Sequence, residues 1–121
     1  MMPDWIKHEL GRLKNTATWS WQGWLTTWRN EKSLRQWGVV NLISIILACL
    51  IDLDGGERAL LIALGLLILV AELFNTAIEE NVDYVSTERD PRAGRAKDAA
   101  SAAVAVTAIA GGLAWVVILI G

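Results

Sequence analysis

Several common kinds of site are excluded by what the chain lacks. Its 121 residues include one cysteine, Cys49, and one histidine, His8. A single cysteine excludes a disulfide within the chain and a cysteine-based metal cluster, and we assign no role to His8. The chain contains neither a GxxxxGK(S/T) loop nor a GxGxxG motif, so both familiar backbone cradles for nucleotide phosphates are missing.

Apolar residues are instead abundant and gathered into three long runs. They make up 54% of the chain, and the runs cover residues 37–51, 59–82 and 99–120. A helix needs about 20 apolar residues to cross a bilayer, so we expect the first helix to begin within residues 31–36. The sequence therefore predicts one all-α membrane domain, residues 1–121. Its transmembrane helices are expected at about 34–51, 58–83 and 96–120.

The segments between the runs predict the topology. Only DLDGGER separates the first two runs, which indicates a helical hairpin closed by a tight glycine-containing turn with solvated Asp52, Asp54 and Glu57. In the second connection, Pro91 and Gly94 suit a loop. The net charge of −2 says little, because the positions of Lys and Arg decide orientation. These residues gather before the first run and between the second and third, so both segments are predicted to be cytoplasmic.

The N-terminal segment, about residues 5–30, has the pattern of an amphipathic surface helix. Its apolar residues recur at spacings of three and four: Leu10, Leu13, Ala17, Trp21, Trp24 and Trp28. Such a helix lies in the membrane interface, with its tryptophans at headgroup depth and its basic residues toward anionic lipid. Two interpretations remain open, a membrane anchor and a lid over a lipid-substrate site.

A polar face interrupts the second apolar run. Glu72, Asn75, Glu79 and Asp83 fall within an arc of about 80° on a helix; we call these four residues the polar seam. Glu72 lies about 20 Å along the helix, within a hydrocarbon core of about 30 Å. An ionisable residue at that depth is by default a functional-site hypothesis and should face other helices or water. Asp83 is expected to pair with a cation.

These residues supply the groups that phosphoryl transfer requires. That reaction needs a base for the attacking hydroxyl, cations on the phosphates and carboxylates for Mg²⁺. Glu72 is the candidate base, and Glu31 and Glu79 are the candidate metal ligands. The phosphate-binding cations would be Lys97 with Arg12 or Arg95.

Three motifs resemble the bacterial integral-membrane diacylglycerol kinase family. They are AELFNTAIEENVD, the later GRAKDAASAAV, and WRNEKSLRQ together with the turn DLD, and the likeness runs from about residue 12 to the C-terminus. The resemblance implies a homotrimer in the bacterial inner (cytoplasmic) membrane. It implies transfer of the γ-phosphoryl group of MgATP to diacylglycerol, giving phosphatidic acid in phospholipid metabolism and recycling. Its partners would be membrane lipid, ATP and further copies of the chain, with no nucleic acid.

The resemblance also implies roles for individual residues. Glu72 matches the general base, Asn75 a catalytic polar partner, and Glu31 and Glu79 the Mg²⁺ ligands. The positions that match nucleotide contacts are Arg12, Trp19, Glu31, Glu79, Glu88, Arg89, Asp90, Lys97 and Asp98. Those that match lipid contacts are Trp21, Trp28, Ser33, Leu34, Arg35, Gln36, Trp37, Arg58, Ser101 and Trp115. The chain departs from the family pattern at Trp19, Trp37, Arg89 and Asp90.

Two alternative functions remain open. The first is an undecaprenol kinase of the same fold, since the acceptor pocket is apolar and the motifs are shared. The second is a small oligomeric proton or cation pathway with Glu72 and Glu79 as relay groups. Such a pathway has no need for the charged loop at residues 88–98 and would conduct without ATP.

Overall fold

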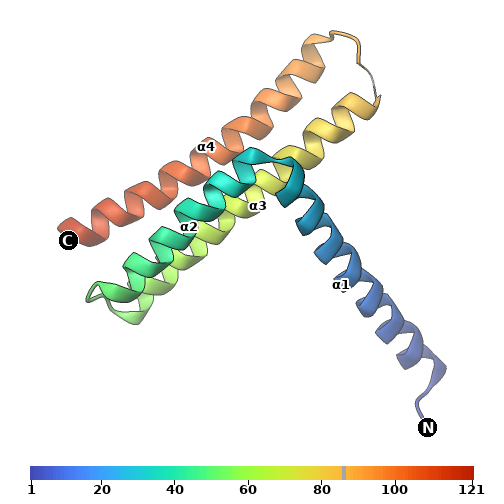
Figure 1. Ribbon diagram of the computed structural model, residues 1–121, viewed down its shortest axis with the longest axis horizontal. Helices are drawn as coiled ribbons and strands as arrows, with labels where there is room; N and C mark the ends of the chain where they lie inside the picture. Colours follow the sequence, from blue (N-terminus) through green and yellow to red (C-terminus); the bar gives the residue numbers. More distant parts are fainter. Residues whose placement is uncertain (86) are drawn as a thin grey trace.

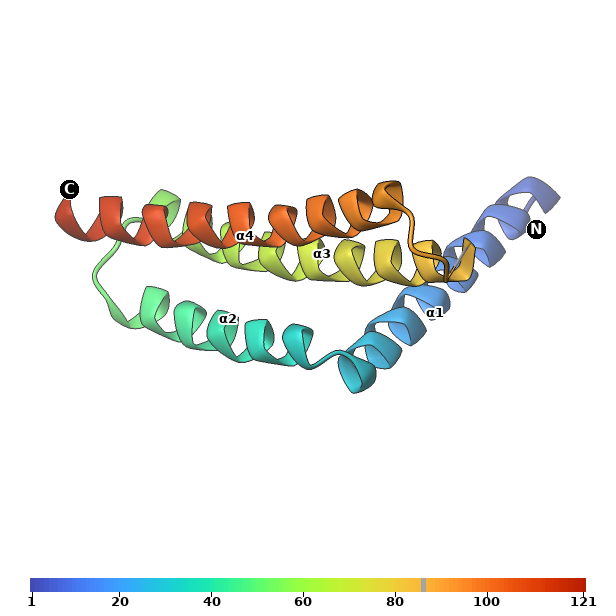
Figure 2. The same cartoon turned by 90° about the horizontal axis from the view of Figure 1, so that it is seen from above.

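The computed structural model describes residues 1–85 and 87–121, and this part of the chain is almost entirely helical. Four helices follow one another in it: α1 (Asp4–Asn30), α2 (Lys32–Leu50), α3 (Gly55–Val85) and α4 (Pro91–Ile120). Helices α2 and α4 both pack on α3, and α1 leaves this bundle at a steep angle (Figures 1 and 2). Helices α2, α3 and α4 are long and apolar enough to cross a membrane. The predicted all-α membrane fold is confirmed.

A single residue, Glu31, joins the surface helix to the first span. Its extended backbone (φ −110°, ψ 108°) ends α1 and precedes α2. Arg35 fixes this elbow by donating to the carbonyls of Trp28 and Arg29, at 2.7 and 2.9 Å. The Trp28 ring lies against Gly38, where an added Cβ would come within 2.6 Å of it. Helix α2 therefore begins inside the predicted window, and Glu31 is held beside the bundle.

The α2–α3 connection is a tight turn, but its glycines do not form it. Gly55 and Gly56 lie in the first turn of α3, and no described residue has a positive φ. The helix starts with a reciprocal cap. The Glu57 backbone N–H donates to Asp54 Oδ1 (2.8 Å), and the Asp54 N–H donates to Glu57 Oε1 (3.1 Å). The expectation of simply solvated carboxylates was therefore wrong for Asp54 and Glu57, whereas Asp52 is exposed as expected.

The prediction that Pro91 and Gly94 lie in a loop was also wrong. Helix α4 begins at Pro91, with Asp90 as its N-cap accepting a bond from the Arg92 backbone N–H at 2.8 Å. Proline suits the first helical position because its missing N–H would have no partner there. The charged segment therefore continues directly into α4.

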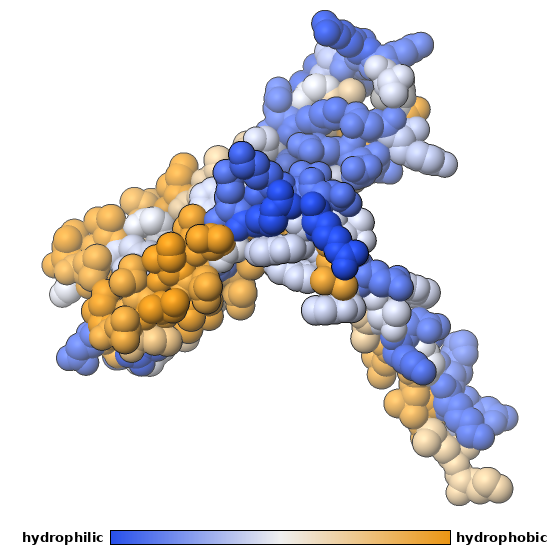
Figure 3. All heavy atoms as spheres, viewed as in Figure 1, coloured by the Kyte–Doolittle hydropathy of each residue, from blue (hydrophilic) through white to orange (hydrophobic). Residues whose placement is uncertain are grey.

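The single chain buries little side-chain surface. Its buried apolar residues are Leu34, Ala48, Leu61, Ile68, Ala100 and Val104, and α1 contributes none. Apolar surface covers much of α2 and of the C-terminal part of α4, whereas hydrophilic surface gathers where α3 ends and α4 begins (Figure 3). We call the part of the bundle where α3 ends and α4 begins the charged end, and the part toward the C-terminus of α4, where most of the surface is apolar apart from the capped α2–α3 turn, the apolar end. The polar seam approaches the charged end.

Candidate active site

Glu72 is the centre of the candidate site. It lies on α3 and is 5% exposed, so it is the buried charged residue of the described chain. From α2, the indole N–H of Trp37 donates toward its carboxyl. Glu79, two turns further along α3, and Glu31 at the elbow are both near enough to act on this carboxyl electrostatically. The fold therefore brings the predicted base and both predicted metal ligands into one acidic region.

Asn75 connects the middle of the seam to Glu79. Its Nδ2 donates to Glu79 Oε1 at 3.2 Å, one helical turn away. Its Oδ1 is buried and has no hydrogen-bond partner among the described residues. Because the amide orients Glu79 and keeps an acceptor available, Asn75 is placed to support a substrate or a hydrated cation.

The acidic region suits a hard divalent cation shared with a substrate. Within the described chain, no group of three or more His, Cys, Asp or Glu side chains is close enough to form a metal cage. Mg²⁺ does not need one, because it is usually held by one or two carboxylates together with substrate phosphates. Glu31 and Glu79 therefore fit Mg²⁺ by donor chemistry, and a cation there would relieve the repulsion that both exert on Glu72.

Lys97 and Asp83 join α4 to α3 at the charged end. Lys97 Nζ lies 2.7 Å from Asp83 Oδ1, and both side chains are partly exposed. The prediction that Asp83 pairs with a cation is confirmed. An ion pair of this exposure contributes little to stability, so its main consequence is to place the Lys97 ammonium beside the end of the seam.

The segment before α4 forms an open hollow of about 390 Å³, lined by several residues predicted to bind nucleotide. They are Glu88, Arg89, Asp90 and Lys97; Asp98 is exposed nearby on α4. The pKa of Asp90 lies below its ordinary value, mainly because the Arg92 side chain donates hydrogen bonds to its carboxylate and, to a smaller extent, because the Arg92 backbone N–H does so. Sequence reasoning missed Arg92, although its place directly after the Asp90-Pro91 pair, two residues beyond the N-cap, signals a cap partner.

Two predicted nucleotide contacts are not brought to this site within one chain. Arg12 and Trp19 lie on the exposed part of α1, which points away from the bundle (Figure 1). Arg12 Nη1 pairs with Glu9 Oε1 at 3.1 Å on the same helix. Of the described residues before α2, therefore, those at the C-terminal end of α1 and the elbow are the ones that approach the bundle.

The residues predicted to contact lipid fall into separate places. Those at the elbow are Trp28, stacked on Trp24 at 5.6 Å between ring centroids, with Ser33, Leu34, Arg35, Gln36 and Trp37. Trp21 and Ser101 are exposed. Trp115 donates from Nε1 to Ser44 Oγ at 2.9 Å, joining α4 to α2. Arg58 lies at the opposite end, where it donates to the carbonyls of Ala48, Ile51 and Leu53 and closes the hairpin.

Fold and site together define a multi-pass helical membrane protein with a buried acidic site that opens toward a charged end. The family model for prokaryotic diacylglycerol kinase matches residues 18–119. A protein named diacylglycerol kinase from Pseudomonas aeruginosa is 44% identical over 125 residues, covering 100% of both chains. One from Escherichia coli K12 is 39% identical over 108 residues, 89% of this chain and 88% of its own. One from Helicobacter pylori is 38% identical over 104 residues, 86% and 81% of the two chains.

The chain belongs to the prokaryotic diacylglycerol kinase family. It is accordingly a lipid kinase of the membrane, and its phosphoryl donor is ATP. The family predicted from the three motifs is confirmed.

Proposed function

We propose that the enzyme transfers the γ-phosphoryl group of ATP to the free hydroxyl of diacylglycerol, giving phosphatidic acid and ADP. The observation that carries this proposal is a carboxylate, Glu72, that is 5% exposed in an apolar bundle yet belongs to a polar seam that runs to the charged end. A lipid hydroxyl reaches it from the membrane, and a nucleotide reaches it from the water. Diacylglycerol is the acceptor in the names of the similar proteins.

Glu72 acts as the general base. The lipid hydroxyl oxygen attacks the γ-phosphorus, the bond from that phosphorus to the bridging oxygen of ADP breaks, and the hydroxyl proton passes to the Glu72 carboxylate. Trp37 orients this carboxylate through its indole N–H. A positioned base contributes roughly 10²- to 10⁴-fold to such a step.

Glu31 and Glu79 would hold the metal, and Asn75 orients Glu79 through its hydrogen bond. A Mg²⁺ ion held by these residues would supply positive charge that offsets the negative charge of the phosphates, including the charge that develops during transfer. The phosphates also meet Lys97, whereas Glu88, Arg89, Asp90 and Asp98 surround the rest of the nucleotide. The chain's own contribution is to place one base and two ligand carboxylates on the elbow and on one helix face.

The working enzyme is proposed to be a homotrimer in the bacterial inner membrane. Two observations support assembly. Large apolar side chains are exposed along α2, α3 and α4. Arg12 and Trp19, which match nucleotide contacts, belong to α1, and this helix points away from the bundle (Figure 1). A neighbouring chain's surface helix would complete each site. The basic residues before α2 and between α3 and α4 support a cytoplasmic N-terminus and a cytoplasmic charged end, on the side of the membrane where ATP is present.

The direct test is transfer of labelled γ-phosphate by purified protein in lipid micelles, with diacylglycerol and undecaprenol offered in parallel. We expect label on diacylglycerol, lost in Glu72→Gln. Label mainly on undecaprenol would move the protein to the polyprenol substrate. Absence of label on both lipids would overturn the proposed function.

A further inference from the structure

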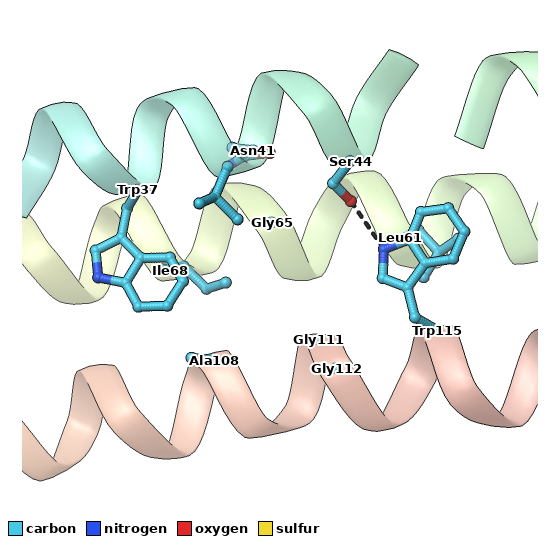
Figure 4. Close-up of a pocket in the computed structure, with 11 residues that line it drawn as sticks. Trp37, Asn41, Ser44, Leu61, Gly65, Ile68, Ala108, Gly111, Gly112 and Trp115 are labelled. Carbon is cyan, nitrogen blue, oxygen red and sulfur yellow. Dashed lines mark hydrogen bonds between the residues drawn. The ribbon is translucent and has the colours of Figure 1, made fainter. Parts of the chain in front are cut away.

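A groove of about 190 Å³ lies between α2 and α4, with α3 as its floor. Trp37 and Trp115 stand at its two ends, and the small residues Ala108, Gly111 and Gly112 keep the α4 side low (Figure 4). The Trp37 end adjoins Glu72, because the Trp37 indole donates toward that carboxyl. The groove therefore leads from the proposed base toward the apolar end of the bundle.

Asn41 is the unusual residue of this groove. Its side chain points from α2 toward Gly65 on α3 (Figure 4) and is 6% exposed. Neither its Nδ2 nor its Oδ1 has a hydrogen-bond partner among the described residues. An amide buried in this way costs free energy unless something pairs with it, because it has left water without replacing its hydrogen bonds.

Gly65 makes the position of Asn41 possible. A Cβ built on Gly65 would overlap Oδ1 and Cγ of Asn41, so the amide occupies the space that any larger residue would fill. The other polar group in the groove differs, since Ser44 Oγ already accepts a bond from Trp115 at 2.9 Å. The groove is thus lined by one satisfied polar pair and by one buried amide whose donor and acceptor have no partner among the described residues.

The spacing along α3 relates Asn41 to the proposed base. Gly65 and Glu72 are two helical turns apart, about 10 Å along the axis. The Glu72 side chain leans back toward the helix N-terminus, which shortens the distance between its carboxyl and the Asn41 amide. In diacylglycerol the ester carbonyls lie a few covalent bonds from the free hydroxyl. If the lipid hydroxyl lies at Glu72 and an acyl chain lies in the groove, an ester group of the same lipid therefore lies next to Asn41.

We propose that Asn41 Nδ2 donates a hydrogen bond to an ester carbonyl of the acceptor lipid, so that the groove is a subsite for acyl esters. This inference rests on the proposed function and adds a determinant of substrate choice. A polyprenol has a hydroxyl and hydrocarbon but no ester, and it leaves the amide unpaired. Sites built to hydrogen-bond a substrate group discriminate against analogues that lack it.

The test compares diacylglycerol with the dialkylglycerol of the same chain length, which keeps the hydroxyl and replaces each ester carbonyl by a methylene. Both are phosphorylated in mixed micelles with saturating MgATP by the wild-type protein and by Asn41→Leu, which keeps the branched shape of the side chain. We expect kcat/KM of the wild-type protein to favour the ester roughly tenfold. In Asn41→Leu the ratio should approach one, and undecaprenol should gain relative to diacylglycerol.

Two further variants make the result specific. Ser44→Ala removes a polar group from the same groove, and we expect it to keep the ester preference. Gly65→Ala forces the Asn41 amide aside, so in the wild-type background it should lower the preference for the ester substrate. In Asn41→Ala, which has no amide to displace, Gly65→Ala should change this preference no further. A double-mutant cycle measures the difference. Gly65→Ala and Asn41→Ala also test whether Asn41 determines the ester preference if Asn41→Leu does not fold.

The outcomes separate the two proposals. Equal ester-to-ether ratios in the wild-type protein and in Asn41→Leu, or no ester preference in the wild-type protein, would overturn the subsite while leaving the kinase intact. Phosphorylation of neither glycerolipid by the wild-type protein would overturn the proposed function itself. A tenfold ratio that collapses only in the Asn41 and Gly65 variants would establish the subsite.

Discussion

The two ends of α3 both carry charged side chains, and they differ in whether those side chains are satisfied within the chain. At the Gly55 end, Asp54 and Glu57 cap each other's backbone, and Arg58 donates to three carbonyls at the end of α2. At the other end, Glu72 is buried near like charges, and the neighbouring amide has a buried oxygen without a partner in the described chain.

This difference distinguishes structural polar groups from functional ones. Most buried polar groups in proteins are hydrogen-bonded, so each exception requires an explanation. The hairpin end needs no ligand, because Asp54, Glu57 and Arg58 all bond to backbone groups at a helix end. The seam is incomplete in the single chain, and in the proposed function a cation, a nucleotide and a lipid hydroxyl supply what it lacks. The same helix therefore closes a hairpin at one end and opens a site at the other.

The largest expected effect is on catalysis, from Glu72→Gln. Gln keeps the shape but cannot accept the hydroxyl proton, so turnover should fall roughly 10²- to 10⁴-fold while MgATP still binds. Thermal stability should stay the same or rise, because a buried charge beside two like charges has been removed. Phosphate transfer and thermal unfolding in micelles measure both. Near-normal turnover would remove Glu72 from the role of base.

Glu79→Gln should act on the nucleotide rather than on the proton. Loss of one charged metal contact, about 1.5–3 kcal/mol, corresponds to a rise of roughly 10- to 100-fold in the KM for MgATP, with a shifted Mg²⁺ dependence. Titrations of initial rate against MgATP and free Mg²⁺ measure this. The matched control is Glu80→Gln, a neighbouring exposed carboxylate on the flank of the seam. Unchanged metal dependence in Glu79→Gln would exclude it as a ligand.

At the hairpin end, Arg58→Gln should act on stability. It removes donors to Ala48, Ile51 and Leu53, and we expect a loss of about 1–3 kcal/mol in unfolding free energy. Unfolding by sodium dodecyl sulfate, followed by helical circular dichroism, measures the loss. The resemblance to the family predicted a lipid contact for Arg58. Unchanged stability with a higher KM for diacylglycerol would favour that role, and it would contradict the view that the hairpin end is purely structural.

The smallest expected effect comes from Asp54→Ala. It removes one half of the reciprocal cap of α3, a change that costs about 0.5–2 kcal/mol at helix N-termini. Because the seam lies at the far end of α3, the KM for MgATP should not change. The same unfolding experiment and nucleotide titration test both statements, and a nucleotide effect would show that the two ends are coupled.

Local sequence rules succeeded where one segment decides the outcome. The spans, the hairpin, the window in which α2 starts and the shared face of the seam all follow from run length and helical period. Pro91 and Gly94 show how such rules fail. Their turn propensity is real, but Asp90 caps the helix and proline suits its first position, so the segment became the start of α4.

The candidate site was predictable only in part, because its residues come from separate elements. Glu72, Asn75 and Glu79 share one helix face and could be read together from their spacing. Trp37 could not be paired with Glu72 by periodicity, since the two side chains meet only when α2 packs on α3. Arg58 likewise acts on α2 from α3, and nothing in the sequence around it indicates those carbonyls.

The sequence by itself determined that this protein is a three-span membrane protein with a surface helix, and that one helix carries acids into the bilayer. These are properties of apolar length and of a 3.6-residue period within single segments. Only the tertiary structure decided that Asn41 faces Gly65 and that Ser44 bonds Trp115, 71 residues away. Such contacts depend on which helix faces meet and at what depth, and packing between helices sets both.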